Sequence, residues 1–334
     1  DQGLKAPVYQ YRNRETGEIF EFDLSELEDI SRFPYRLQCE QYKMTRLLAN
    51  LVNESGHGAV EFNRRVVAFE QDSNGVTVFV ETPYDIERYR ADYLIGADGA
   101  NSIVRKWLGV EFEGFTYPEK FLCLSTDWPL EEHFQKLSYV NYVADPNEWV
   151  VLLRVPTLWR VLVPAENEDP DPYLTSDEKK NDIFDRLIGE DDAVRTEHRT
   201  IYKVHQRVAK RYVENRVLLV GDSAHLNNPL GGLGMNSGIH DAWNLCEKLV
   251  DILKNGADAS ELLPRYERQR RKVMLDFVQA QTINNKRSME STNSEAREAY
   301  QREMQEILSD DERRRAYLLK QSMYQSLSDA AAIQ

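Results

Sequence analysis

The fold of this chain is decided by residues 216–236, which read RVLLVGDSAHLNNPLGGLGMN. The apolar run 217–220 predicts a short buried strand. Gly221 and Asp222 follow at its end, where a carboxylate can accept hydrogen bonds from the hydroxyl groups of a ligand. The glycines that come next let the backbone approach a planar ligand closely. We expect a helix to begin near Met235, where free amides and the helix dipole favour negative charge.

Residues 93–105 repeat this pattern and read YLIGADGANSIVR. A short apolar strand again runs into a glycine, and Asp98 follows in the turn. Ser102 stands where it can cap a helix, so a plain turn before a capped helix would explain this stretch taken alone. An aspartate at two separate strand ends favours a ligand-binding role instead.

A third informative stretch, residues 41–48, reads QYKMTRLL and opens a helix that we expect to reach residue 52. Its apolar side chains follow the spacing of one helix face, namely Met44, Leu47, Leu48 and Leu51. Gln41 at the start of this helix is a candidate ligand contact or an ordinary surface residue. Arg36, just upstream, could likewise contact a ligand or only solvate a strand.

Alternating and apolar patterns give the other elements. We expect a hairpin over residues 7–24, and strands over 60–70 and 75–81 that flank a turn. Residues 111–206 are aromatic and rich in β-type segments, which indicates a separate sheet. From residue 261 the chain is charged and mainly helical. The helix after the Gly-rich turn is expected to bury an apolar face that includes Ile239, Ala242, Cys246, Leu249 and Leu253.

The three stretches resemble the FAD-dependent aromatic hydroxylases, the group A flavoprotein monooxygenases of the 4-hydroxybenzoate hydroxylase type. Residues 216–236 are similar to their second flavin-binding motif, where a Gly-Asp pair, a His, a Pro and a Gly-rich run ending in an apolar-Asn pair occur in this order. Residues 93–105 resemble the Asp-Gly motif that lies beside the FAD pyrophosphate and continues into Ser-x-x-Arg. Residues 41–48 are similar to the helix whose first Gln contacts the flavin chain. The resemblance covers about residues 7–275.

This resemblance implies an α/β fold, with a Rossmann-like FAD-binding domain that lacks its first βαβ unit and is interleaved with a β-sheet substrate domain. C-terminal helices complete it. The expected boundaries are residues 1–110 and 207–260 for the FAD-binding domain, 111–206 for the substrate domain and 261–334 for the helical region. The hairpin is expected to join the substrate sheet.

Family members begin with a strand, a G-x-G-x-x-G turn and a helix that hold the FAD pyrophosphate. No such turn occurs near Asp1, and the surrounding sequence looks like the middle of a chain. We therefore expect upstream residues in the complete protein. The given chain alone would contact only part of FAD and would bind it weakly or not at all.

The resemblance also implies the site residues. Amides of the Gly-rich turn are expected at the pyrimidine edge of the flavin, and the Pro229 carbonyl is expected to face the substrate. His225 and His205 are candidate general bases because imidazole titrates near neutral pH, with a packing role as the alternative for each. The expected cofactor-binding residues are Gln41, Asp98, Gly99, Arg105, Gly221, Asp222, Pro229, Gly232, Gly234, Met235 and Asn236, with Pro229 and His225 as candidate catalytic residues.

The implied reaction uses FAD as cofactor and NADH or NADPH as co-substrate. Oxygen adds to the reduced flavin, and the terminal oxygen of the resulting flavin hydroperoxide passes to an electron-rich aromatic ring. The protein positions the ring, excludes water and stabilises charge on the flavin. Trp149, Trp159 and Tyr142 in the aromatic segment could line the substrate pocket or belong to the core.

Composition limits the partners. The formal charge of −14, from 42 basic and 56 acidic residues, argues against nucleic acid or anionic membranes as general partners. No run of 18 or more apolar residues and no secretory signal is evident, so we expect a cytoplasmic protein without a membrane span and with a homodimer possible. The histidines lack metal-ligand spacing, and we expect no metal. The three cysteines, Cys39, Cys123 and Cys246, suit buried apolar positions better than disulfides.

Three other functions stay open at this point. A flavin-dependent halogenase would share the architecture, but its Trp-x-Trp signature is missing, since residues 159–161 offer only Trp159. Epoxidation of an alkene is harder to exclude. A flavin-free relic that acts as a binding or regulatory module would fit the missing N-terminal turn.

Overall fold

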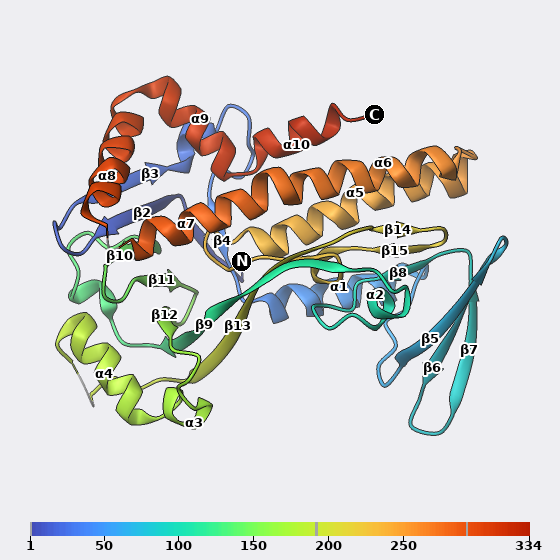
Figure 1. The fold of residues 1–334 in the computed structure, drawn as a ribbon, viewed down its shortest axis with the longest axis horizontal. Coiled ribbons are helices and arrows are strands. Elements are labelled where there is room, and N and C mark those ends of the chain that lie inside the picture. Colours follow the sequence, from blue (N-terminus) through green and yellow to red (C-terminus); the bar gives the residue numbers. More distant parts are fainter. Residues whose placement is uncertain (1, 191–192, 292) are drawn as a thin grey trace. The chain divides into compact units, whose positions relative to one another are not determined.

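The computed structural model describes residues 2–190, 193–291 and 293–334, and the chain forms two compact units (Figure 1). Unit 1 comprises Asp1–Gly58, Tyr117–Val204 and Lys286–Ser322, and unit 2 comprises Ala59–Thr116, His205–Asn285 and Met323–Gln334. Three elements contribute residues to both units, namely β9 (Phe112–Thr126), β13 (His198–Ala209) and α7 (Ala280–Glu290).

Six neighbouring strands of an eight-stranded sheet organise unit 1, in the order β9-β12-β11-β10-β2-β3. The expected hairpin is confirmed as β2 and β3, and β2 pairs in parallel with β10, so that Tyr11 lies beside Tyr142. Apart from β9 and β13, the strands of this unit are β1 (Leu4–Ala6), β2 (Val8–Asn13), β3 (Ile19–Asp23), β4 (Arg36–Gln38), β10 (Val140–Ala144), β11 (Val150–Arg154) and β12 (Trp159–Ala165). Its helices are η1 (Leu24–Leu27), α1 (Gln41–Ser55), η2 (Leu130–Glu132), α3 (Asp171–Leu174), α4 (Asp177–Ile188), α8 (Ser294–Ser309) and α9 (Asp311–Gln321).

Aliphatic and aromatic side chains cover the two faces of this sheet differently. On one face, Leu152 and Trp159 pack with Phe184 of α4 in an apolar core. On the other face, Tyr11 meets Tyr300 of α8, with ring centroids 6.2 Å apart. Alternation of side chains along the strands separates the two faces.

Two small sheets organise unit 2. One has the order β14-β15-β8 and the other the order β5-β6-β7. The strands are β5 (Arg65–Asp72), β6 (Gly75–Glu81), β7 (Ile86–Ala91), β8 (Leu94–Gly96), β14 (Val213–Glu214), β15 (Val217–Leu219) and β16 (His225–Leu226). The helices are α2 (Ile103–Trp107), η3 (Gly221–Ser223), α5 (Leu233–Asn255), α6 (Ala259–Lys272), η4 (Val273–Gln279) and α10 (Tyr324–Ala331), of which η4 is a π-helix.

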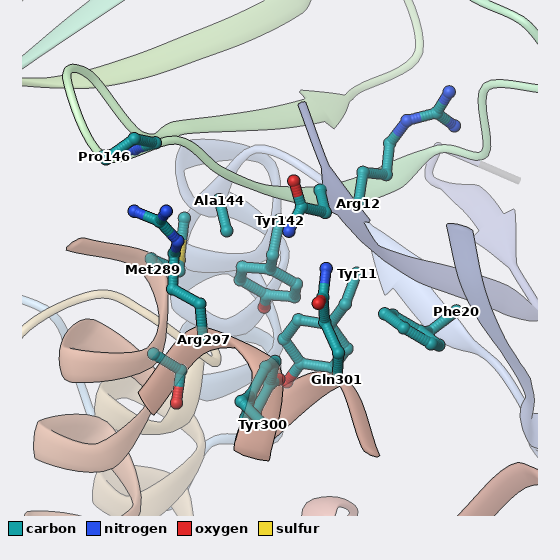
Figure 2. A pocket seen from close by; sticks show the side chains of 12 residues that line it. Tyr11, Arg12, Phe20, Tyr142, Ala144, Pro146, Met289, Arg297, Tyr300 and Gln301 are labelled. Carbon is teal, nitrogen blue, oxygen red and sulfur yellow. The ribbon is translucent and has the colours of Figure 1, made fainter. Parts of the chain in front are cut away.

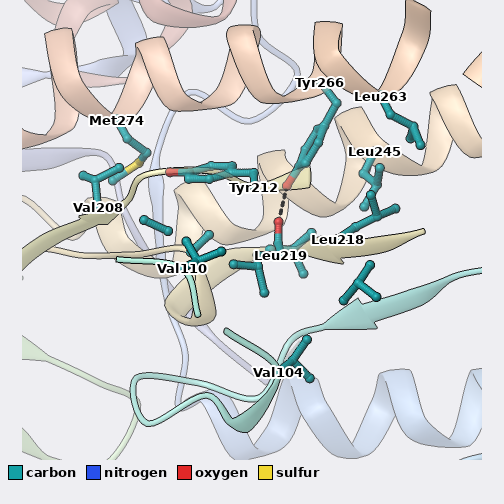
Figure 3. Packing of buried hydrophobic residues seen from close by; sticks show 14 of the residues in the cluster. Val104, Val110, Val208, Tyr212, Leu218, Leu219, Leu245, Leu263, Tyr266 and Met274 are labelled. Carbon is teal, nitrogen blue, oxygen red and sulfur yellow. Dashed lines mark hydrogen bonds between the residues drawn. The ribbon is translucent and has the colours of Figure 1, made fainter. Parts of the chain in front are cut away.

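The core of unit 2 lies between β15 and the helices α5 and α6 (Figure 3). Leu218 is fully buried there, together with Leu245 of α5 and Leu263 of α6. The hydroxyl group of Tyr266 donates a hydrogen bond of 2.6 Å to the carbonyl of Leu219, which ties α6 to the end of the strand. Burial raises the pKa of Tyr266 well above its usual value, so the phenol is a neutral donor.

Several expected boundaries need correction. The strand expected over residues 60–70 begins only at Arg65, because Asn63 adopts a left-handed conformation, with φ of 55°, that interrupts an extended chain. Helix α5 begins at Leu233, slightly before the expected start. The helix expected to begin at Gln41 is confirmed as α1.

The apolar face expected for α5 was wrong except at Leu249, which packs partly buried against the core of unit 2. Ile239 is 46% exposed and Leu253 is 53% exposed, and both Ala242 and Cys246 are exposed as well. The buried side of the helix instead consists of Leu233, Ser237, Asp241, Leu245 and Lys248. The hydrophobic pattern failed here because Asp241 and Lys248 on the buried side find hydrogen-bond partners inside the unit.

The units group the chain differently from the expected domains. Residues 1–58 belong with 117–204, because hairpin β2–β3 extends the sheet of that unit. The C-terminal helices divide between the two units. All three cysteines are free, and only Cys123 is buried, so the apolar role expected for Cys246 does not hold. Within the described ranges, no helix combines the length and apolarity needed to cross a membrane.

Candidate functional site

Parallel pairing brings the two aspartate-bearing turns together in unit 2. Strand β15 runs beside β8 with Leu219 in register with Gly96, so both strands end at the same edge. The amide of Val220 donates a hydrogen bond of 3.0 Å to the carbonyl of Gly96. Ligands of open α/β sheets bind at such carboxyl ends.

Two buried side chains lock these turns to each other. The hydroxyl of Ser223 donates to the carbonyl of Gly96 at 2.5 Å. The guanidinium of Arg105 donates to the carbonyl of Ser223 and to the carbonyl of Ala100, each at 2.7 Å, and lies over the ring of Phe112 at 3.8 Å. Burial lowers the pKa of Arg105, although the nearby Asp98 charge works in the opposite direction. Arg105, predicted as a cofactor contact, therefore holds the backbone of both turns.

Ser102 caps helix α2, since its hydroxyl accepts from the amide of Arg105 at 2.9 Å, and Asp98 supports this cap from the first turn. One carboxylate oxygen accepts from the hydroxyl of Ser102 at 2.6 Å, and the other accepts from the amide of Val104 at 3.1 Å. Gly99 follows with φ of 78°, a left-handed conformation that glycine adopts without strain. The capped helix anticipated as an alternative is thus present, and contact of Asp98 with a cofactor stays a prediction.

Asp222 is exposed, as Asp98 is, but it differs from Asp98 because its side chain makes no hydrogen bond within the described ranges. It follows Gly221, whose φ is 60°. Gly238 of α5 faces this glycine so closely that a Cβ on Gly238 would lie 3.1 Å from the Gly221 Cα. The missing side chains let the turn rest directly on the helix, and the sequence analysis had not singled out Gly238.

The Gly-rich loop leads from this turn into α5. Gly231 and Gly232 have φ of 109° and 70°, and the amide of Gly232 donates to the Pro229 carbonyl at 3.0 Å. The side-chain amide of Asn236 donates a hydrogen bond of 2.7 Å to the carbonyl of Gly232. Met235 is 40% exposed, and the first amides of α5 have no partners within the helix. The loop therefore presents free backbone donors next to exposed side chains.

A buried amide cluster supports the loop from behind, and no motif in the sequence predicts it. The Gln206 side-chain oxygen accepts from the backbone amide of Asn228 at 3.0 Å. The Asn228 side chain donates to the Thr282 carbonyl at 3.0 Å, and Asn285 donates to the Leu230 carbonyl at 3.1 Å. These partners come from distant segments, so only the fold assembles them.

His225 and Asp241 form the polar base of the site. The Nε2 atom of His225 lies 2.6 Å from one oxygen of Asp241, which also accepts the Gly221 amide at 3.0 Å. The other oxygen accepts from Nε of Arg270 at 2.7 Å. All three side chains are at most 1% exposed. His205, the other candidate base, is placed differently, with Nδ1 2.9 Å from the Thr116 hydroxyl.

Unit 1 holds the remaining predicted residues. Gln41 is exposed at the first position of α1. Arg36 donates to the hydroxyl of Tyr142 at 3.0 Å and lies 4.4 Å over the ring of Tyr9. Burial tends to lower the pKa of Arg36, but the surrounding phenol groups raise it above its usual value. Arg36 thus packs within unit 1 rather than only solvating a strand, and its contact with flavin stays a prediction.

The two tryptophans for which a pocket role and a core role were both open belong to the core of unit 1. Trp149 and Trp159 are 3% and 1% exposed. Figure 2 shows a small cavity in the same unit, lined by the rings of Tyr11, Tyr142 and Tyr300. Its volume of about 20 Å³ suits roughly one water molecule rather than an aromatic ring. This cavity would have to widen before it could hold a substrate.

The residues of unit 2 fit a flavin. Asp222 offers an unpaired carboxylate for ligand hydroxyl groups, and Gly221, Gly231 and Gly232 leave the backbone bare for close approach. The start of α5 supplies amides where negative charge can develop. No group of three or more metal-binding side chains occurs in the part of the chain that the structure describes.

Comparisons with known proteins agree with this geometry. Residues 3–281 match the family described as FAD binding domain. The chain is 32% identical over 282 residues to para-nitrophenol 4-monooxygenase from Pseudomonas sp. strain WBC-3, an alignment that covers 83% of this chain and 69% of that protein. It is also 32% identical over 295 residues to 6-hydroxy-3-succinoylpyridine 3-monooxygenase from Pseudomonas putida, covering 86% and 72%. The crystal structure of p-nitrophenol 4-monooxygenase from Pseudomonas putida DLL-E4 is similar, with a TM-score of 0.90, 28% identity, and coverage of 97% of this chain and 82% of that one.

Proposed function

The chain belongs to the FAD binding domain family, and from this premise we propose that it hydroxylates a small aromatic molecule with NADH or NADPH and O2. Its relatives named above are, by their names, monooxygenases of para-nitrophenol and of 6-hydroxy-3-succinoylpyridine. A phenol-like or heteroaromatic substrate is therefore proposed here too. These names favour hydroxylation over epoxidation, halogenation and a flavin-free relic.

The observation that carries the proposal is the free carboxylate of Asp222 beside bare backbone. Residues 221–223 pack against α5, and the Gly-rich loop connects this turn to the start of the same helix. We propose that Asp222 binds hydroxyl groups of the flavin chain and that the amides of Gly234, Met235 and Asn236 contact the ring system. FAD, when bound, supplies the redox and oxygen chemistry.

The protein's own residues would then orient the flavin and the substrate and exclude water. The left-handed glycines keep the loop open to a planar group, and the buried amide cluster behind the loop fixes its shape. Pro229 and His225 stay predictions as catalytic residues, as do Gln41 and Asp98 as cofactor contacts. A homodimer and a cytoplasmic location likewise stay predictions from the sequence.

A flavin titration combined with oxygen uptake tests this function. We expect the purified protein, in the longest form encoded, to quench FAD fluorescence and to show the visible spectrum of bound oxidised flavin. NADH or NADPH oxidation should be slow alone and much faster with a phenol, an aminobenzoate or a hydroxypyridine. The product should gain one oxygen atom by mass.

Two results would contradict the proposal in different ways. Oxygen incorporation only into alkenes, or chlorination, would overturn hydroxylation and leave the cofactor assignment intact. Absence of flavin binding by every form of the protein would overturn both.

A further inference from the structure

We infer that Asp241 is the positioning residue that holds the turn at residues 221–223 and sets the proton on His225, and that this arrangement prepares the turn for FAD. The cofactor half of the inference rests on the proposed function. The half that concerns the turn and His225 stands on the geometry of unit 2 alone. Asp241 lies on the buried side of α5, the face that hydrophobic patterning failed to identify.

The three hydrogen bonds to Asp241 require a carboxylate. One oxygen accepts from both His225 and the Gly221 amide, and the other accepts from Arg270. A backbone amide and a guanidinium can only donate, so neither oxygen can carry a proton without displacing a donor. Burial alone would raise the pKa of Asp241, but the adjacent His225 and Arg270 hold it below its usual range.

The carboxylate in turn fixes the tautomer of His225. Nε2 of the ring lies 2.6 Å from a carboxylate oxygen, and two acceptors cannot share that contact, so Nε2 carries the proton. Nδ1 is buried and has no hydrogen-bond partner among the described atoms. A proton on Nδ1 would leave a buried donor unpaired, which is costly. The contact with Asp241 therefore places a proton on Nε2, and Arg270 balances the charge of Asp241.

This arrangement controls the path of the chain at the turn. Asp241 contacts the first residue of the turn through Gly221 and the strand that follows it through His225. The exposed Asp222 lies between these two fixed points. Because Arg270 of α6 anchors Asp241 from the other side, the position of Asp222 is set by residues that need not touch the cofactor themselves.

Asp241→Asn is the informative variant because it keeps size and removes the charge. Whichever way the amide group turns, its NH2 faces a donor: either Arg270, or Gly221 together with His225. We expect the His225 proton to move to Nδ1, since Nε2 can then accept from the new NH2. The Gly221 amide should lose hydrogen-exchange protection. FAD affinity should fall by about 5- to 150-fold, the range for losing one buried hydrogen bond.

The measurements are nitrogen NMR of ring-labelled histidine, hydrogen exchange of the Gly221 amide and a fluorescence titration with FAD. Asp251→Asn is the matched control, because Asp251 is an exposed aspartate on the same helix. It should change none of the three. The wild-type histidine spectrum needs no variant, so the inference can be tested even if Asp241→Asn fails to fold.

Each outcome either supports or overturns the role of Asp241. A wild-type His225 with its proton on Nδ1 and none on Nε2 overturns the inference. So does a folded Asp241→Asn protein with unchanged FAD affinity and unchanged Gly221 protection. If the wild type binds no FAD, the proposed function fails and the cofactor half fails with it, while the tautomer and the exchange data still decide whether Asp241 sets the turn.

Discussion

Removing the Arg105 guanidinium should loosen both turns of the site at once. Arg105 is 4% exposed and donates to the carbonyls of Ser223 and Ala100, each at 2.7 Å. Hydrogen bonds to a charged group are each worth about 1.5–3 kcal/mol, and stacking over Phe112 adds about 0.5–2 kcal/mol. Replacement by methionine also removes a buried charge, which offsets part of this loss. We expect Arg105→Met to lower the free energy of unfolding by about 2–4 kcal/mol.

The assay is urea denaturation together with FAD titration of each folded variant. Arg105→Lys should fall between wild type and Arg105→Met, because a lysine cannot reach two carbonyls with fixed geometry. Arg88→Met is the control: Arg88 is exposed in the same unit and also lies over a ring, that of Phe79 at 5.1 Å. Equal unfolding midpoints for Arg105→Met and Arg88→Met would refute the idea that Arg105 joins the turns. A loss of FAD affinity without loss of stability would instead make Arg105 a direct cofactor contact.

Three further predictions concern the same unit. Asp222→Ala should weaken FAD binding by about 5- to 150-fold with little change in stability, measured by fluorescence titration against Asp92→Ala, another exposed aspartate. Gly234→Val should hinder flavin binding, because its Cβ would lie 3.3 Å from Asn227 Oδ1 and the added branch needs more room; normal quenching would contradict this. Burial, and then the Arg270 charge, lower the pKa of His240, so its contribution to stability is complete above about pH 6.5 and declines as the pH falls through that value. His240→Gln should flatten this slope in urea titrations between about pH 5 and 7.

The strands, the turns and their chemistry could be read from the sequence because each is a local pattern. The apolar run before Gly221 forms β15, and the run before Asp98 forms β8. The glycines of the loop adopt the left-handed conformations that make glycine necessary at Gly231 and Gly232. These features depend on residues close in sequence, so patterning and turn rules suffice.

What the sequence could not give is the polar framework behind the turns. Arg270 reaches Asp241 from α6, and Gln206 reaches Asn228 from β13. No spacing rule joins such positions, since the contacts form only after the strands and helices have packed. Hydrophobic periodicity also predicted the wrong buried face for α5, because it counts Asp241 as a surface residue although the side chain is fully buried.

The two aspartates that looked alike in sequence therefore have different roles, one structural and one available for a ligand. Both carboxylate oxygens of Asp98 accept hydrogen bonds at the start of α2, one from the Ser102 hydroxyl and one from the amide of Val104, so Asp98 supports the cap of that helix. Asp222 follows the neighbouring strand and is exposed like Asp98, but its carboxylate makes no hydrogen bond within the described ranges. A buried carboxylate beneath it, Asp241, does for this turn what Asp98 does for its own. Because Asp241 takes over the structural role, Asp222 is left available for a ligand, and this difference makes the second turn the better candidate for the contact that decides flavin affinity.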